Sequence, residues 1–360
     1  MTNLENKIPI KSYATFDPLK HCWIGSGFKT EWFSDLDIYK NDKIMDPLKR
    51  IAEETEEDYQ DLEKILKDAG VKTYRSVLDR EKYKTLEKIM RPPMFPRDHF
   101  AVVGEKLYVT GGAHFTFEDM IRSVDRKDLH IEVSLPHKAG ELDVNSASMT
   151  RVGKDIWWDV EKPLADNYHT FRTDNYASKQ DRQKSIDKYK NMWEEQGFRV
   201  HLTHRGYHSD GVLSVVKPGC IVSLADVHNY EKDFPGWDVL YLPDSHFSYH
   251  SDFNKMKDKV GGRWWLKGEE HNDQLIDFVN TWLNDWVGLV AETVFDVNML
   301  SIDQNTIICN NYNKEVFAHF KKHKVEPIIY NFRHRYFWDG GIHCMTQDLY
   351  REGTMVDYFA

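Results

Sequence analysis

The sequence predicts one α/β domain over residues 1–360, built from about five strand-rich units arranged around a pseudo-symmetry axis. Three observations predict this class: a β-hairpin pattern recurs along the chain, further strands return after helical or loop segments, and helical patterns precede several of these strands. No linker, low-complexity tract or charge block separates the units. Each unit can bury its apolar face only against its neighbours, so loops of different units should converge at the axis.

The elements follow in order from local patterns. Val- and Ile-rich arms flank Gly, Pro or Asp turns in hairpins expected at 100–110, 148–160, 212–224 and 298–310. Returning strands are expected at 71–77, 129–136, 198–204, 237–243 and 325–331. Helices are expected at 46–70, 179–197 and 313–323, and the first has apolar residues at mostly helical spacing and ends at a glycine, Gly70.

Composition favours a small molecule as the partner. A net charge of −10 without a Lys/Arg stripe argues against nucleic acid, whose phosphates demand a basic face. The N-terminus has no apolar stretch, and no apolar run approaches the roughly 18–20 residues of a membrane span, so we expect a cytoplasmic protein without a membrane partner. Four cysteines without CxxC spacing indicate neither a disulfide framework nor a thiolate zinc site.

Three polar loops at strand ends contain the candidate site residues. PPMFPRDHF (92–100) contains Arg97 and Asp98, RGYHSDG (205–211) contains His208 and Asp210, and GGIHCMT (340–346) contains Cys344. A histidine near a cysteine lowers the thiol pKa, and two carboxylates are the partners that a planar guanidinium binds most specifically. Residues i and i+2 of an extended segment share one side, so His208 and Asp210 can face one cavity.

Each of these residues also has a structural interpretation. Cys344 could be buried filler, His208 a satisfied core histidine, and Asp98 a turn cap or a partner of Arg97. His343 would point away from the site if its segment is extended, which favours a structural role. His246 and His250 have the spacing of a helical metal pair, but their surroundings indicate a loop, so no metal site is expected there.

Five motifs, in order along nearly the whole chain, resemble the glycine amidinotransferase family of the guanidino-group-modifying, or pentein, superfamily. They are YATFDPLKHCWIG (13–25), MFPRDHFAVVG (94–104), MTRVGKDIW (149–157), YHSDGVLSVVKPGCIVSL (207–224) and GGIHCMTQDLYREGT (340–354). The resemblance implies a five-bladed αβ propeller of ββαβ-type units, in agreement with the repeat count. It also implies arginine and an amine acceptor as substrates and no metal or organic cofactor. The oligomeric state is open, with a homodimer as one alternative.

The resemblance assigns roles to individual residues. Cys344 matches the nucleophile, His208 the general acid/base, and Asp98 and Asp210 the carboxylates that hold the donor guanidinium. The implied reaction transfers the amidino group of arginine through an amidino-cysteine to glycine, which gives guanidinoacetate and ornithine. Arg97, beside Asp98, is counted with the substrate-binding residues.

The sequence departs from the family pattern at several positions. Asn145 stands where the family has an aspartate that orients the histidine, and Asp143, two residues earlier, is the alternative and is counted with the substrate-binding residues. Val227 replaces an arginine expected to hold the donor carboxylate, and Ala291 and Glu292 fall where serines are usual. Donor and acceptor identity are therefore open.

Two other classes stay open. A hydrolase resembling arginine deiminase or dimethylargininase would use the same cysteine, histidine and aspartates but admit water and release citrulline. A non-catalytic arginine-binding or structural protein is the other alternative, supported only by the change to Asn145.

Overall fold

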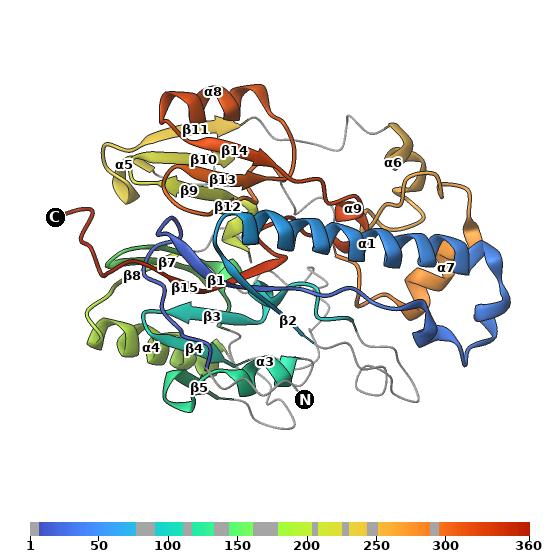
Figure 1. The fold of residues 1–360 in the computed structure, drawn as a ribbon, viewed down its shortest axis with the longest axis horizontal. Helices are drawn as coiled ribbons and strands as arrows, with labels where there is room; N and C mark the ends of the chain where they lie inside the picture. Colours follow the sequence, from blue (N-terminus) through green and yellow to red (C-terminus); the bar gives the residue numbers. More distant parts are fainter. Residues whose placement is uncertain are drawn as a thin grey trace.

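Five three-stranded sheets form the β-structure in this computed structural model, which describes residues 7–76, 91–110, 117–132, 144–160, 179–203, 208–224, 230–242, 251–288 and 295–360 (Figure 1). The first two are β3 (Phe100–Val103), β4 (Lys106–Val109) and β5 (Leu129–Ile131), then β6 (Met149–Val152), β7 (Asp155–Asp159) and β8 (Arg199–Thr203). The next two are β9 (Leu213–Lys217), β10 (Cys220–Leu224) and β11 (Asp238–Leu242), then β12 (Leu300–Ser301), β13 (Thr306–Cys309) and β14 (Glu326–Ile329). The fifth contains β15 (Thr346–Arg351), β1 (Leu19–Ile24) and β2 (Lys72–Arg75).

All five sheets have the same topology. A central strand pairs antiparallel with a hairpin partner on one side and parallel with a returning strand on the other. The four expected hairpins and five expected returning strands are therefore confirmed where the structure describes them. Two of the hairpin turns begin with a glycine at positive φ, Gly104 (58°) and Gly153 (64°), as a two-residue turn that matches the strand twist requires.

The fifth sheet joins the two ends of the chain, a pairing that the sequence analysis did not predict. Its hairpin partner is β15, which pairs antiparallel with β1, with Cys22 opposite Asp348 and Trp23 opposite Gln347. Figure 1 shows these two strands side by side. The fifth unit therefore combines strands from both ends of the chain.

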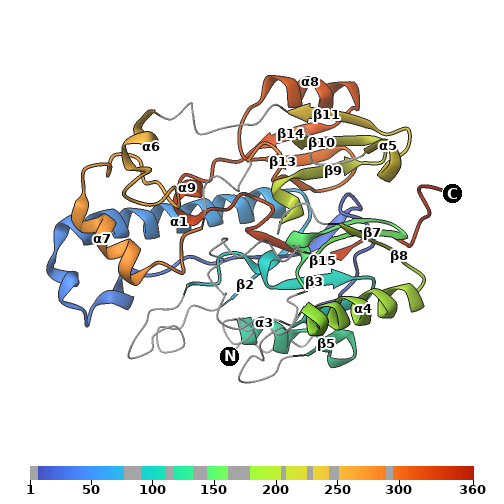
Figure 2. The ribbon, with the colours of Figure 1, turned by 180° about the vertical axis from the view of Figure 1, so that it is seen from behind.

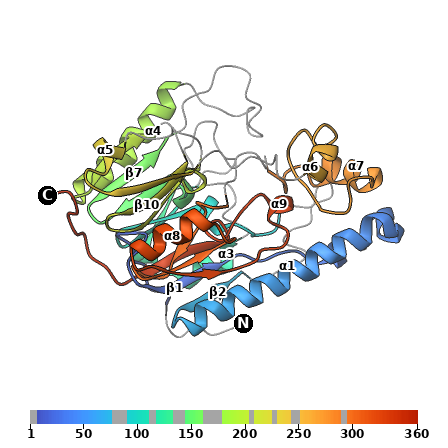
Figure 3. The same ribbon diagram turned by 90° about the horizontal axis from the view of Figure 1, so that it is seen from above.

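Helices lie outside the sheets. They are α1 (Asp42–Asp68), α3 (Glu118–Ser123), α4 (Lys179–Glu195), α5 (Tyr230–Asp233), α6 (Ser251–Met256), α7 (Asp273–Trp282), α8 (Lys314–Lys322) and α9 (Arg335–Trp338). Figure 2 shows α3, α4 and α8 around the sheets, and Figure 3 shows α1 running along one side toward α7. The three expected helices are thus confirmed, although α1 begins earlier, at a cap where the Asn41 side chain accepts a hydrogen bond from the Lys43 backbone N–H (3.2 Å). Among the described residues, none of the helices combines the length and the apolar character that a membrane crossing needs.

A buried ionic cluster ties the units together around Asp348 of β15. Its carboxylate accepts hydrogen bonds from Arg97 Nη2 (2.9 Å), Arg151 Nη2 (2.7 Å), Arg351 Nε (3.1 Å) and Ser12 Oγ (2.8 Å). Burial alone would raise the pKa of Asp348, but the three guanidinium groups hold it well below its usual range. Because the arginines come from three different segments, this one carboxylate connects strands that are far apart in the sequence.

Candidate active site

The candidate residues lie at equivalent points of four sheets, just before the first strand of each. Asp98 ends the 3₁₀ helix η3 (Pro96–Asp98) before β3, and Asp210 lies in η8 (Ser209–Gly211) before β9. Asn298 precedes β12 by two residues, and Cys344 lies in the turn two residues before β15. The repeated topology therefore brings together side chains that are far apart along the chain.

The thiol of Cys344 sits between an amide and a carboxylate. Asn298 Nδ2 lies 3.2 Å from Cys344 Sγ and 3.2 Å from Asp210 Oδ2, and the Cys344 sulfur is 3.6 Å from that same oxygen. Cys344 is 5% exposed and Asp210 is 6% exposed. The sulfur and one of the two expected guanidinium-binding carboxylates therefore face the same buried space.

The second expected carboxylate, that of Asp98, interacts electrostatically with Asp210. Burial raises the pKa of Asp98, and the charge of Asp210 raises it further, against the opposing charges of His208 and Arg91. Oδ1 of Asp98 and Oδ1 of Asp210 are both buried, and neither has a hydrogen-bond partner among the described residues. Two buried acceptor atoms without donors are costly, so the arrangement favours a cationic ligand that donates to both.

The charges of these two carboxylates also act on the Cys344 thiol. Burial holds the pKa of the Cys344 thiol well above its usual value, and the charges of Asp210 and Asp98 raise it further, while the Asn298 hydrogen bond opposes the rise. The raised pKa favours the protonated thiol at neutral pH.

His208 precedes η8 directly, as its N-terminal cap residue, with extended backbone angles. A positive charge on this imidazole would lower the pKa of both Asp98 and Asp210, so the ring lies near both carboxylates. Its expected part as general acid/base stays a prediction.

His343 lies in a turn and contacts the site, contrary to the extended segment expected from the sequence. Its Nδ1 is 2.8 Å from Asp210 Oδ2, and its backbone N–H donates to Asn298 Oδ1 (3.0 Å). Burial and the charge of Arg97 lower the pKa of His343 to about 4, so the ring is neutral at pH 7 and Nδ1–H must donate to the carboxylate. Burial would raise the pKa of Asp210, but this hydrogen bond and the nearby positive charges keep it below its usual value.

Arg97 is buried next to the loop that contains Cys344. It is 1% exposed, pairs with Asp348, and donates from Nε to the backbone carbonyls of His343 (2.7 Å) and Thr346 (2.8 Å). These contacts occupy its guanidinium, which favours a role in positioning the Cys344 loop over the substrate contact expected from the sequence. The alternative pairing of Arg97 with Asp98 is not the one that the structure contains.

Asn145 caps a third short helix, η6 (Ser146–Ser148), which packs between η3 and η8. Its Oδ1 accepts from Ser148 N–H (2.9 Å) and from Ser148 Oγ (2.9 Å). This oxygen is thus engaged with Ser148, and the expected orientation of His208 by Asn145 stays a prediction. The alternative orienter, Asp143, lies outside the described residues, as do Val227, Ala291, Glu292, His246 and His250.

The two glycines before His343 are required by close packing. A Cβ on Gly340 would lie 2.3 Å from Cζ of Phe95, and a Cβ on Gly341 would lie 2.5 Å from Asn298 Oδ1. Asn310 fixes the same loop, because its Oδ1 accepts from the Ile342 N–H (2.8 Å). Asn298 and Asn310 were missed by the sequence analysis, although both lie in the hairpin expected at 298–310.

Comparisons with known proteins agree with this architecture. No protein-family model matches the chain. A mitochondrial glycine amidinotransferase from Xenopus laevis is 22% identical over 174 residues, a match that covers 45% of this chain and 32% of that protein. A saxitoxin-pathway amidinotransferase from Microseira wollei superimposes with a TM-score of 0.65 at 17% identity, over 98% of this chain and 100% of that one. The inosamine-phosphate amidinotransferase of Streptomyces griseus gives 0.59 at 16% identity, over 97% and 99%.

The fold is therefore the pentein fold. The expected five-bladed αβ propeller and the resemblance to glycine amidinotransferase are both confirmed. The pentein fold also occurs in hydrolases: dimethylarginine dimethylaminohydrolase from Pseudomonas aeruginosa superimposes with a TM-score of 0.51 at 11% identity, over 91% of this chain and 98% of that one. The matched curated relative is about three times longer than the segment that aligns, so its complete activity does not carry over directly.

Proposed function

We propose that the protein is an amidinotransferase that moves the amidino group of L-arginine to an amine acceptor, with glycine as the expected acceptor. The observation that carries the proposal is the Cys344 sulfur beside Asp210, with two buried carboxylate oxygens, of Asp98 and Asp210, that have no donor among the described residues.

A guanidinium ion suits these oxygens. It is planar, always charged and carries five N–H donors, so it can donate to both carboxylates at once. At about 4 Å and an effective dielectric constant of roughly 20, one such charge pair is worth on the order of 4 kcal/mol before desolvation is subtracted. The same positive charge would lower the pKa of the Cys344 thiol, so substrate binding and nucleophile ionisation are coupled.

The first half-reaction transfers the amidino group to sulfur. His208 accepts the thiol proton, the Cys344 sulfur bonds to the guanidinium carbon, and the bond from this carbon to the ornithine nitrogen breaks. The proton on His208 passes to the departing amine. The products of this half are ornithine and a cationic amidino-cysteine.

The second half-reaction reverses these roles. An acceptor amine attacks the amidino carbon, His208 takes a proton from it, and the carbon–sulfur bond breaks. That proton returns to Cys344 as the guanidino product leaves. His343 stays neutral and keeps Asp210 ionised through its hydrogen bond, and Arg97 holds the loop that contains the sulfur.

The proposal is tested with arginine labelled at the guanidino carbon, incubated with the protein with and without glycine. We expect label on the Cys344 peptide in both cases, ornithine in excess of enzyme only with an acceptor, and labelled guanidinoacetate when glycine is the acceptor. Turnover with another amine but not with glycine would revise the acceptor. The absence of both adduct and product would contradict the proposal.

Two cysteine variants provide a matched control. Cys344→Ser should abolish the adduct, whereas Cys309→Ser, which removes a buried sulfur that contacts Met299 Sδ, should leave it in place. The runner-up function is hydrolysis of a guanidino compound, favoured by the hydrolases that share the fold. Citrulline formed without an amine acceptor, in an amount equal to the arginine consumed, would identify the hydrolase.

A further inference from the structure

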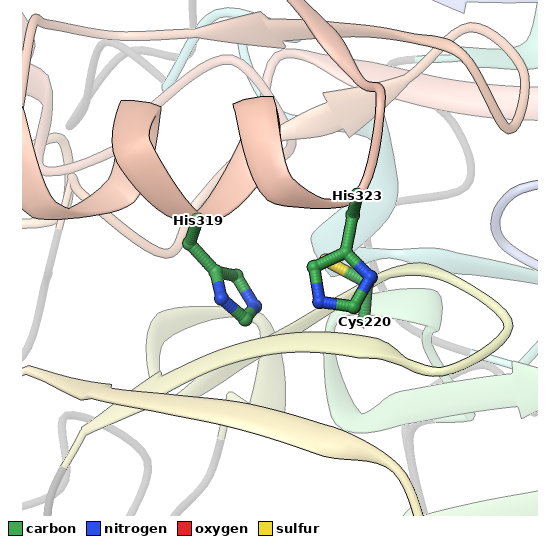
Figure 4. A group of neighbouring side chains, drawn as sticks. All are labelled: Cys220, His319 and His323. Atoms are coloured by element: carbon green, nitrogen blue, oxygen red, sulfur yellow. The ribbon is translucent and has the colours of Figure 1, made fainter.

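A second group of reactive side chains lies away from Cys344, between two neighbouring units. Cys220 is the first residue of β10 and is fully buried, and His319 and His323 are four residues apart at the end of α8. Residues i and i+4 share one face of a helix, and Figure 4 shows both imidazole rings extending from α8 toward Cys220. The sheet of β9–β11 and the helix of the next unit thus contribute to one cluster.

The donor atoms are close enough for a single metal ion. One ligand atom of each residue lies within 4.8 Å of the others. In a tetrahedral site with bond lengths of about 2.0–2.3 Å, ligand atoms are separated by roughly 3.3–3.6 Å. A contraction of about 1 Å, within the range of side-chain rotation, would complete that geometry.

A carboxylate stands beside the cluster. Asp238 is the parallel-strand partner of Cys220, and its Oδ2 lies 2.6 Å from His323 Nε2 and 3.8 Å from His319 Nδ1. Lys322 contacts the same oxygen (2.6 Å) with a side chain that is 66% exposed, so this lysine can turn into solvent when another cation arrives. Asp238 can thus complete the ligand set or orient His323 toward the metal.

An unpaired buried nitrogen is the second, independent observation. His319 is 8% exposed, and its Nε2 is buried without a hydrogen-bond partner among the described residues. The His319 ring also has a hydrogen bond with the backbone of Ile221, yet Nε2 has no partner among the described residues, and a buried nitrogen without a partner is costly. A metal ion between Cys220 and the two histidines would account for it.

We propose that Cys220, His319 and His323, with Asp238, bind one zinc-class divalent ion that fastens α8 to the sheet of the neighbouring unit. Thiolate and imidazole donors select zinc and related transition metals over Mg²⁺ and Ca²⁺, which prefer oxygen ligands. Binding releases the Cys220 thiol proton to solvent, and the resulting thiolate, two neutral imidazoles and one carboxylate balance the charge of the ion. The residues are distinct from the Cys344 site, so this proposal and the proposed function fail or succeed separately.

The test is a titration of the chelator-treated full chain with Co²⁺ and with Zn²⁺. We expect one equivalent of each to bind, tetrahedral visible bands and a sulfur-to-cobalt charge-transfer band for Co²⁺, and a rise in Tm with Zn²⁺ but not with Mg²⁺. The titration is repeated in a Cys344→Ala background, because the catalytic thiol could itself contribute to a cobalt signal.

Variants separate a metal site from a packing cluster. His323→Gln, at a half-buried position that tolerates an amide, and Cys220→Ser should each weaken Zn²⁺ binding more than about 100-fold, and Asp238→Asn about 10–100-fold. Cys309→Ser is the matched control, since Cys309 lies in the same apolar cluster as Cys220 and should leave affinity unchanged. No zinc binding by the full chain, an octahedral cobalt spectrum, or affinities that both His323→Gln and Cys220→Ser leave unchanged would overturn the proposal.

Discussion

Replacing Asn298 with alanine should make the Cys344 thiol harder to ionise. Asn298 Nδ2 is the amide that lies 3.2 Å from the sulfur, and Asn298 Oδ1 accepts the backbone N–H of His343 (3.0 Å). The alanine variant loses a donor that stabilises the thiolate, while Asp210 keeps the hydrogen bond from His343 that lowers its pKa. The pKa of Cys344, already raised by burial and by Asp210, should therefore rise further.

The size of the effect follows from the contact that is lost. Hydrogen bonds to charged groups contribute about 1.5–3 kcal/mol. Since 1.36 kcal/mol corresponds to one pKa unit, the expected rise is roughly 1–2 units, or about 10–100-fold less thiolate at a fixed pH. The buried His343 N–H left without an acceptor should also lower the free energy of unfolding by about 1–3 kcal/mol.

The assay is the rate of iodoacetamide alkylation at Cys344, followed by peptide mass spectrometry as a function of pH. Asn310→Ala is the matched control: Asn310 is a buried amide that also accepts a backbone N–H of this loop, from Ile342. Its hydrogen bond to Asn298 goes to the backbone carbonyl, and no contact joins it to the sulfur in the described structure. It should lose comparable stability without a change in the alkylation profile. Equal profiles for Asn298→Ala and wild type, or equal shifts in the two variants, would refute the reasoning.

Three further predictions concern the surroundings of the site. Asp348→Asn leaves three buried guanidinium groups without their carboxylate, so the free energy of unfolding in urea should fall by about 3–5 kcal/mol. The exposed control Glu118→Gln should lower it by less than about 0.5 kcal/mol, and equal losses would contradict this prediction. Folding lowers the pKa of His343 from its ordinary value of 6.5 to about 4, so the unfolded chain binds more protons between these two pH values. The free energy of unfolding should therefore rise with pH in this window, by up to about 1.4 kcal/mol per pH unit. His343→Gln should flatten this slope, and an unchanged slope would exclude His343 as its source. Gly341→Ala places a Cβ 2.5 Å from Asn298 Oδ1, so turnover should fall more than 10-fold, on the order of 1.4 kcal/mol or more in the barrier, with far-UV circular dichroism unchanged; full activity would show that the loop can yield.

Local patterns in the sequence were sufficient to predict most of the fold. The hairpins have tight turns and β-branched arms, and both signals lie within about ten residues, so their positions follow without knowledge of the rest of the chain. The returning strands and the three helices follow from the same short-range signals. The pairing of β15 with β1 joins opposite ends of the chain, and no local pattern encodes it.

The residues of the candidate site also fall into those that the sequence predicts and those that it does not. Cys344, His208, Asp98 and Asp210 lie in conspicuous polar loops, so residue chemistry and the resemblance together were enough to select them. Asn298 was missed because it opens a hairpin arm and carries no charge, although it holds the position before β12 that Asp98 holds before β3. Comparison of equivalent positions in the five repeated units is the signal that could have identified Asn298.

Other details needed backbone geometry. The orientation of His343 was predicted from an extended segment, but the turn before β15 directs its Nδ1 to Asp210. The cluster of Cys220, His319 and His323, the proposed metal site, combines residues that are about a hundred positions apart, so rules on CxxC spacing could not address it.

The ionic cluster at Asp348 and the candidate site share one mechanical connection. Arg97 bonds Asp348 with one nitrogen and the carbonyl oxygens of His343 and Thr346 with another, and these two residues flank the cysteine loop. A lysine has one compact charge and could not keep this fork of contacts, so the guanidinium geometry matters as much as its charge. The positive charge of Arg97 also helps to lower the pKa of Asp210, while Oδ1 of Asp98 and Oδ1 of Asp210 have no donor in the described part of the chain. Arg97 therefore favours the ionised form of Asp210 from within the protein, and the two carboxylate oxygens without donors suit the cationic guanidino donor of the proposed reaction.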